Sequence, residues 1–326
     1  MAVSGNNVIV AIPRHIQIFD LAVSDIPVFN LDTKDMGLKD FKVTSMEFRA
    51  ATLTADRGYL VWMGTKEGHL FELDIRTGCV TSSKLSAHLH PVTHIFRHGN
   101  SMITLDDLGK ALLFSPDAEG LEDVRLTGTR PRVVRIAEKQ EFAKMIGGKL
   151  WTATRLDLHG GGSTIKTPSI RVYDIFKPGS VGKSVLPTEH VGPVTSATIL
   201  PSQPEHVYVG HEEGFVTLWS LETEDGFPQC IEVMKVSMYD VLSLEGVNDR
   251  LWAGGRNGMI SAYDVASRPW VVTNCWMAHP GLPVLRLAVD HYGLEKTGRM
   301  CVVSVGRDEQ LKLWDGLLGS DWIGEF

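Results

Sequence analysis

Adjacent carboxylates are the residues of this chain whose types and spacing come nearest to acid–base chemistry. Pairs at polar turns include Asp106 with Asp107, Glu212 with Glu213, and Asp308 with Glu309. Two carboxylates facing one another across a cleft can divide the roles of general acid and general base, as glycoside hydrolysis requires. Each pair here occupies adjacent positions of a polar turn, where a solvated capping role is more common. We therefore expect these carboxylates to stabilise turns and not to catalyse a reaction.

Other catalytic signatures are missing from the sequence. It contains no G-x-x-x-x-G-K-[ST] loop, no H-E-x-x-H helix and no G-x-S-x-G elbow, and GHEEG and GGRNG are followed by strand patterns and not by helices. The four cysteines, Cys79, Cys230, Cys275 and Cys301, form no C-x-x-C pair, which indicates reduced thiols and a cytoplasmic protein. We predict no catalytic residue, no metal and no cofactor.

A different constellation lies between residues 279 and 315. His279 precedes a short apolar strand, Ser304 lies in a second strand, Asp308 lies in the following turn, and Trp314 lies in a third strand. A histidine that bridges the aspartate and the serine, with an indole N–H at the far end, would satisfy polar groups that packed sheets otherwise leave unpaired. The four residues resemble the Asp-His-Ser-Trp tetrad of WD-repeat proteins, and this resemblance implies a structural role.

The same strand–turn–strand pattern recurs along the whole chain. Seven segments end in an aromatic or aliphatic residue followed by aspartate or serine, at Asp20, Asp74, Ser115, Asp174, Ser220, Asp264 and Asp315. Their spacing is close to the roughly 40 to 45 residues of a WD-type unit once loop insertions are allowed. The pattern predicts an all-β protein, a seven-bladed WD-repeat β-propeller in which residues 1–326 form a single domain.

Further strands are expected to complete each four-stranded blade. Inner strands are predicted at residues 42–48, 92–96, 132–136, 194–199, 241–244 and 284–289, and outer strands at residues 26–31, 79–85, 121–126, 231–236, 271–276 and 321–326. In blade one only Ala2 to Ser4 remain for the inner strand, so we expect the chain to be a segment of a longer protein. His88 and His190 repeat the position of His279 and are expected to brace their own blades. The glycine-rich stretch at 155–169 is either a functional loop or a disordered insertion.

Three stretches carry a more particular resemblance. The segments beginning SIRVYDIFKPG, VLSLEGVNDRLW and GRMCVVSVGRDEQ are similar to the WD-repeat region that precedes the catalytic domain of fungal and plant inositol polyphosphate 5-phosphatases. The Trp-x-x-Asp-x-Asn and Pro-x-Trp-Cys-Asp-Arg stretches of that catalytic domain do not occur in this sequence. The resemblance therefore implies a non-catalytic scaffold that binds proteins, with a phosphatase domain on its C-terminal side in the parent chain.

Charged residues recur at one aligned position of the blades. Equivalent turns of a propeller emerge on one face, so Arg14, Lys66, Arg256 and Arg307 are predicted to form a basic arc facing Asp107 and Glu212. Arginine presents a planar fork to carboxylates and phosphates. The arc predicts a protein or peptide partner that is acidic or phosphorylated. The alternative is that these charges only solvate the rim.

Two other functions remain open, an enzyme with a site at the central channel and a structural spacer. The inner strands begin with apolar or hydroxyl-bearing residues, which does not favour the enzyme. The Arg-Arg-Gly signature of phosphoinositide-binding propellers is absent. The net charge of −7 argues against nucleic acid as a partner, and no apolar run is long enough for an integral membrane segment.

Overall fold

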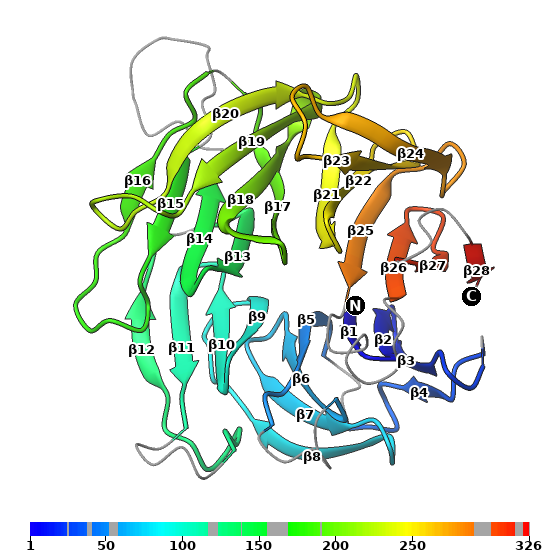
Figure 1. Cartoon of the computed structure of the whole chain (residues 1–326). Coiled ribbons are helices and arrows are strands. Elements are labelled where there is room, and N and C mark those ends of the chain that lie inside the picture. Colours follow the sequence, from blue (N-terminus) through cyan, green and yellow to red (C-terminus); the bar gives the residue numbers. More distant parts are fainter. Residues whose placement is uncertain are drawn as a thin grey trace, which may run out of the picture. The chain divides into compact units, whose positions relative to one another are not determined.

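The computed structural model describes residues 1–24, 26–37, 41–51, 58–116, 123–137, 139–154, 169–189, 191–289, 301–316 and 322–325. In these residues the strands form seven four-stranded antiparallel sheets (Figure 1). This confirms the predicted all-β, seven-bladed β-propeller. The chain divides into two compact units, Met1–Gln140 with three sheets and Glu141–Phe326 with four.

The first unit contains the first to third sheets. The first sheet has the strand order β1 (Ala2–Ser4), β2 (Asn7–Ile12), β3 (His15–Asp20) and β4 (Phe29–Asp32). The second has β5 (Val43–Phe48), β6 (Leu60–Thr65), β7 (Leu70–Asp74) and β8 (Cys79–Lys84). The third has β9 (Val92–His98), β10 (Ser101–Asp106), β11 (Lys110–Phe114) and β12 (Arg132–Arg135).

The second unit contains the fourth to seventh sheets. The fourth has β13 (Phe142–Ile146), β14 (Lys149–Thr154), β15 (Ser169–Tyr173) and β16 (Lys183–Val185). The fifth has β17 (Val194–Leu200), β18 (Gln203–His211), β19 (Phe215–Ser220) and β20 (Gln229–Lys235), with a 3₁₀ turn η1 (Glu212–Gly214) between β18 and β19. The sixth has β21 (Val241–Val247), β22 (Arg250–Gly255), β23 (Met259–Asp264) and β24 (Val271–Met277). The seventh has β25 (Val284–Val289), β26 (Cys301–Gly306), β27 (Leu311–Asp315) and β28 (Trp322–Glu325).

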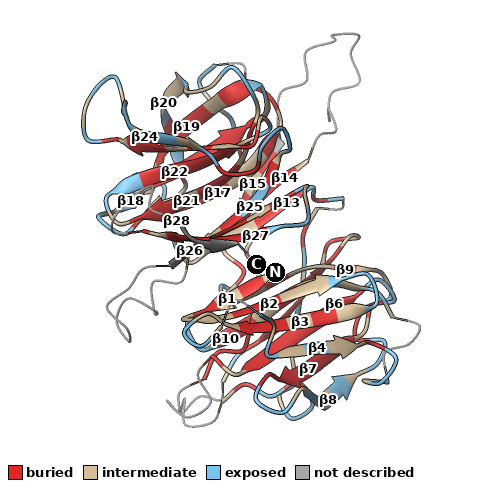
Figure 2. Ribbon diagram, turned by 90° about the vertical axis from the view of Figure 1, so that its right-hand side faces the viewer, coloured by how far each residue is buried: buried red, intermediate tan, exposed pale blue. Residues whose placement is uncertain are grey.

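Burial rises from the outer strand of a sheet toward its middle. Every residue of β6 and β7 is buried, whereas β8 alternates between exposed and partly buried residues (Figure 2). A strand buried on both faces needs a continuous apolar run, and a strand with one wet face needs alternation. The sequences LVWMGT of β6 and CVTSSK of β8 meet these two requirements.

The core of each unit lies between successive sheets. One apolar cluster joins Ile9 and Ile18 of the first sheet to Phe48 and Met63 of the second. In the second unit the indole rings of Trp151 and Trp219, from the fourth and fifth sheets, meet edge to face with their centroids 5.8 Å apart. Such aromatic contacts contribute about 0.5–1.5 kcal/mol beyond their buried area. Successive blades therefore stabilise one another, as expected for units that cannot cover their own faces.

Two expected strands were wrongly placed. Residues 132–136 were predicted to begin the fourth blade, but β12 pairs with β11 and closes the third sheet. The predicted outer strand at 121–126 is not a strand over its described residues, 123–126. The fourth sheet begins instead with β13, which turns into β14 through Gly147 and Gly148, both at positive φ. Such two-residue turns match the twist of the strands that they join.

The predicted strands at both ends of the chain are present in the structure, whereas other predictions are not tested by it. The short inner strand β1 pairs with β2, from Ala2 opposite Ile9 to Ser4 opposite Asn7. At the other end, β28 pairs with β27, close to the predicted strand at 321–326. His190 and residues 155–168 lie outside the described residues. The single domain over residues 1–326 stays a prediction.

Candidate partner-binding surface

The tetrad in the seventh sheet is a continuous chain of hydrogen bonds. The Nδ1 atom of His279 lies 2.9 Å from each carboxylate oxygen of Asp308, and its Nε2 atom lies 2.9 Å from Oγ of Ser304. The indole N–H of Trp314 donates to the same hydroxyl over 2.8 Å. Asp308 also accepts a bond from the backbone N–H of Gln310, which caps the turn between β26 and β27. The four side chains thus link a turn, a loop and two strands.

The third sheet contains a related chain with different partners. The His88 ring lies 3.0 Å from Oδ2 of Asp106 and 2.8 Å from Oγ1 of Thr104. Asp106 Oδ1 accepts the backbone N–H of Lys110, so this carboxylate caps its turn, as expected. Asp106 is only 2% exposed, however, and the expectation of a solvated carboxylate was wrong for it. His88 braces the sheet as the sequence predicted.

The fifth sheet uses a histidine that the sequence analysis missed. His211, at the end of β18, lies 2.9 Å from Oγ1 of Thr217 through Nε2 and 2.8 Å from the carbonyl of Gly192 through Nδ1. Trp219 donates its indole N–H to the same Thr217 hydroxyl over 2.8 Å. The buried threonine two residues before a tryptophan was the available signal, because a buried indole and a buried hydroxyl both need partners.

His88 and His211 are both held in the neutral form. Burial lowers the pKa of His211 to about 4, against a smaller upward effect of the Gly192 carbonyl. Burial also lowers the pKa of His88, and this outweighs the nearby Asp106 carboxylate. Neutral imidazole can donate from one nitrogen and accept at the other, which suits a structural brace between two polar groups.

The four predicted turn cations all have exposed side chains. Each lies in the tight turn between the second and third strands of its sheet, and they are Arg14, Lys66, Arg256 and Arg307. In the sixth sheet, Asp240 connects this turn to its neighbour. Its carboxylate pairs with Nε of Arg256 and accepts the backbone N–H of Glu213, which lies in the turn of the fifth sheet. Arg256 is therefore engaged through Nε, while 58% of its side chain stays exposed.

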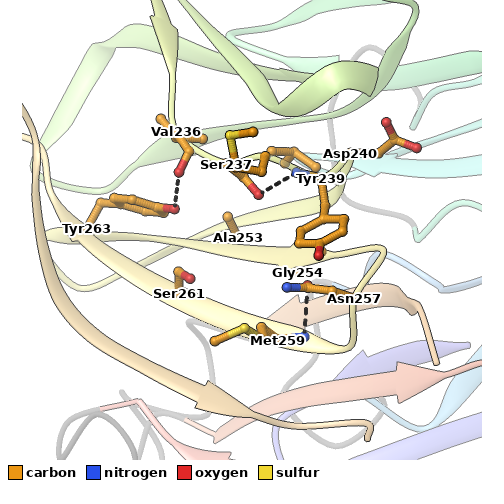
Figure 3. A pocket seen from close by; sticks show the side chains of 13 residues that line it. Val236, Ser237, Tyr239, Asp240, Ala253, Gly254, Asn257, Met259, Ser261 and Tyr263 are labelled. Atoms are coloured by element: carbon orange, nitrogen blue, oxygen red, sulfur yellow. Dashed lines mark hydrogen bonds between the residues drawn. The ribbon is translucent and has the colours of Figure 1, made fainter. Parts of the chain in front are cut away.

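A cavity of about 220 Å³ lies beside this turn in the second unit (Figure 3). Asn257 closes one side and accepts the backbone N–H of Met259 with its side-chain oxygen over 3.2 Å. Tyr263 forms another side and donates its hydroxyl to the carbonyl of Val236. The neighbouring Met238 and Tyr239 are 85% and 53% exposed. Exposed apolar side chains next to a cation are typical of protein contact surfaces.

The first unit brings two predicted cations near a third that the sequence analysis did not select. The backbone N–H of Lys66 donates to the carbonyl of Lys42, just before β5. Lys42 and Arg14 line the same cavity, between the first and second sheets. Lys42 had been assigned only to the start of an inner strand. Asp107 and Glu212, the predicted acidic counterparts, are both half-buried.

The seven four-stranded sheets and the hydrogen-bonded chains around His279, His88 and His211 define a WD-repeat β-propeller. Similar chains of known structure include one in the crystal structure of the mitotic checkpoint complex, with a TM-score of 0.69, 14% identity, and coverage of 96% of this chain and 85% of that one. Two others have TM-scores of 0.62. They are the Cps50 (Swd1) β-propeller domain of Myceliophteria thermophila, 14% identical over 87% of this chain and 86% of its own, and Sqt1 of Chaetomium thermophilum, 15% identical over 96% and 80%. These likenesses show the fold.

One curated relative is closer in sequence. A probable inositol polyphosphate 5-phosphatase of Schizosaccharomyces pombe is 29% identical to this chain over 98% of its length. The match covers 26% of that protein, so this chain spans about a quarter of the relative's length. No protein-family model matches the chain. Within the described residues, no helix is long and apolar enough to cross a membrane.

Proposed function

We propose that this chain is a non-catalytic platform that binds an acidic or phosphorylated segment of a partner protein through Arg14, Lys66, Arg256 and Arg307. The observation that carries the proposal is their placement, since each occupies the equivalent turn of its own sheet with its side chain exposed. A rigid sheet that presents variable turns is a common basis for recognition. Exposed guanidinium groups can form paired hydrogen bonds with carboxylates and phosphates.

We further propose that the platform is the WD-repeat part of an inositol polyphosphate 5-phosphatase. The similarity to the S. pombe protein over nearly the whole of this chain supports this proposal. About three quarters of that relative lies outside the match, which leaves ample length for a separate catalytic domain. In this proposal the platform works in the cytoplasm, where the unpaired thiols of Cys79, Cys230 and Cys275 would stay reduced.

Charge reversal tests the binding proposal. A fluorescent octaglutamate peptide serves as the probe, and its affinity is measured by fluorescence anisotropy. The variant Arg307→Glu is expected to weaken binding about tenfold, because it replaces an attraction with a repulsion. Lys177→Glu, an equal change of net charge at an exposed loop position between β15 and β16, is the matched control and should leave binding unchanged. Equal loss in both variants would mean that only net charge matters and would refute the proposed site.

A further inference from the structure

A second cavity has the features of a binding pocket for a defined side chain. It has a volume of about 440 Å³ and lies within the first unit, between the turn that joins β2 to β3 and the residues that lead into β5. This volume falls in the range of about 300–1,000 Å³ that is typical of small-ligand sites. Arg14 and Lys42 line it from opposite sheets, and His15 lies beside Arg14.

The cations at this cavity are available to a ligand. Arg14 and Lys42 are exposed, and neither side chain has an ion-pair partner among the described residues. The carboxylate of Glu67 accepts the backbone N–H of Lys42 over 3.3 Å, and Glu67 does not line the cavity. Two positive charges at one mouth favour a ligand group that carries two negative charges.

Apart from His15 and Thr33, the rest of the wall is apolar, and parts of it are held in place by neighbouring residues. Phe41 lies edge-on to His69, with ring centroids 4.7 Å apart, and packs near Phe71 with centroids 5.5 Å apart. Ile12, 41% exposed, and Val43 also belong to the apolar lining, together with Ala11 and Pro13. On the cationic side, both the backbone N–H and the hydroxyl of Thr33 donate to the Arg14 carbonyl, over 2.9 and 3.2 Å. Because the wall is already ordered, a ligand would lose little free energy in arranging it.

We propose that this pocket binds a phosphate monoester carried on an aromatic ring, that is, a phosphorylated tyrosine side chain of the partner protein. The phosphate would lie between Arg14 and Lys42, and the ring would lie against Phe41, Ile12 and Val43. Phosphorylated serine or a carboxylate would leave the apolar wall exposed, and an unmodified tyrosine would leave the cations unpaired. This inference rests on the proposed function and gives the chemistry of the partner group that Arg14 would bind.

Phenyl phosphate is the probe, and methyl NMR of the whole chain is the measurement. We expect phenyl phosphate to shift the methyl resonances of Ile12 and Val43 saturably, and phenol and inorganic phosphate to shift them far less at equal concentration. Arg14→Gln and Lys42→Ala should each raise the dissociation constant about tenfold. The control Lys34→Ala changes an exposed lysine of the same unit that does not line the cavity, and it should have no effect.

Each other outcome overturns the inference. Equal shifts with phenol would show that the cations do not contribute, and equal shifts with inorganic phosphate would show that the apolar wall does not. If phenyl phosphate does not shift the methyl resonance of Ile12, but Arg307→Glu loses octaglutamate binding, the pocket is rejected and the proposed function stays intact. Binding of phenyl phosphate at Ile12, with octaglutamate binding unchanged in Arg307→Glu, would reject only the proposed role of Arg307.

Discussion

A single hydroxyl connects a histidine to a tryptophan in both the fifth and the seventh sheets. In each case the oxygen is fully buried, accepts an indole N–H and bonds an imidazole nitrogen. A hydroxyl has one donor and two acceptor positions, so these two bonds use it almost completely. Because water cannot replace the partners in a packed interior, removing the oxygen leaves two rings unsatisfied.

Ser304→Ala tests this role. We expect the free energy of unfolding to fall by about 2 kcal/mol, because a buried indole N–H and an imidazole nitrogen lose their partner. Ser304→Thr keeps the hydroxyl and should lose less, since Thr104 occupies the equivalent place in the third sheet and its hydroxyl bonds His88. Urea unfolding of the whole chain measures both variants. Equal losses in the two would show that the hydroxyl is not what matters at this position.

The buried histidine of the fifth sheet predicts a pH dependence of stability. The pKa of His211 in the folded state, about 4, lies below its ordinary value of 6.5, so the folded state binds fewer protons between these values. The stability contributed by the neutral ring is present above pH 6.5 and is lost as the pH falls toward 4, by about 3 kcal/mol in all. Urea unfolding at pH 7.5 and pH 5 measures the loss. His211→Gln should lose distinctly less than the wild type over this interval, and an identical loss would contradict the assignment.

The tight turns set how each sheet meets the loop behind it. Gly258, in the turn between β22 and β23, has φ of 85° and its carbonyl accepts the backbone N–H groups of both Ala278 and His279. A Cβ atom at this position would collide with the carbonyl oxygen of His279. The glycine is therefore required twice, by the backbone angle and by the close approach. The same loop holds the tetrad histidine, so the turn also positions that ring.

Two alanine substitutions separate these requirements. Gly258→Ala should lower the free energy of unfolding by more than about 2 kcal/mol, because it combines backbone strain with a collision. Gly281, at φ of 70°, has open space around it, so Gly281→Ala should cost only the strain, about 1 kcal/mol. Thermal or urea unfolding compares them. Similar losses of unfolding free energy in the two variants would mean that the loop containing His279 moves aside easily to accommodate the new Cβ atom.

Most strands could be predicted because a hairpin with a glycine turn has a strong local pattern. The first strand of the fourth sheet could not, because Phe142–Ile146 mixes polar and apolar residues, whereas Arg132–Arg135 contains an apolar pair. Periodicity finds a strand but does not say which sheet it joins. For the same reason the sequence revealed the turn cations but not Lys42, which shares a cavity with Arg14 only because two sheets meet there.

The whole molecule combines a negative net charge with exposed basic turns. The net charge of the whole chain is −7, whereas the four cations place positive charge only at their own exposed turns. The two fields act over different distances, because ions screen charges beyond about 10 Å at 0.1 M salt. An acidic partner would thus be repelled on approach and attracted at contact. We infer that recognition of such a partner depends more on slow release than on fast encounter.

Salt should therefore change the two rate constants differently. Between 50 and 500 mM sodium chloride, we expect the dissociation rate of the octaglutamate peptide to rise several-fold and its association rate to change little or to increase. Surface plasmon resonance with the immobilised chain measures both. An association rate that falls steeply with salt would mean that the basic turns dominate the field at long range, contrary to this view.

The brace of the third sheet also determines how the repeats should be compared. Counting from the strand hydroxyl, Asp308 lies four residues after Ser304, and the matching position after Thr104 is Leu108. The carboxylate that holds His88 comes instead from Asp106, two residues earlier. Carboxylates with the same structural role thus occupy different positions in the sequence of their repeats. An alignment that judges each column separately would discount Asp106 and assign importance to Leu108, whereas superposing the sheets in space pairs the groups that do the same work.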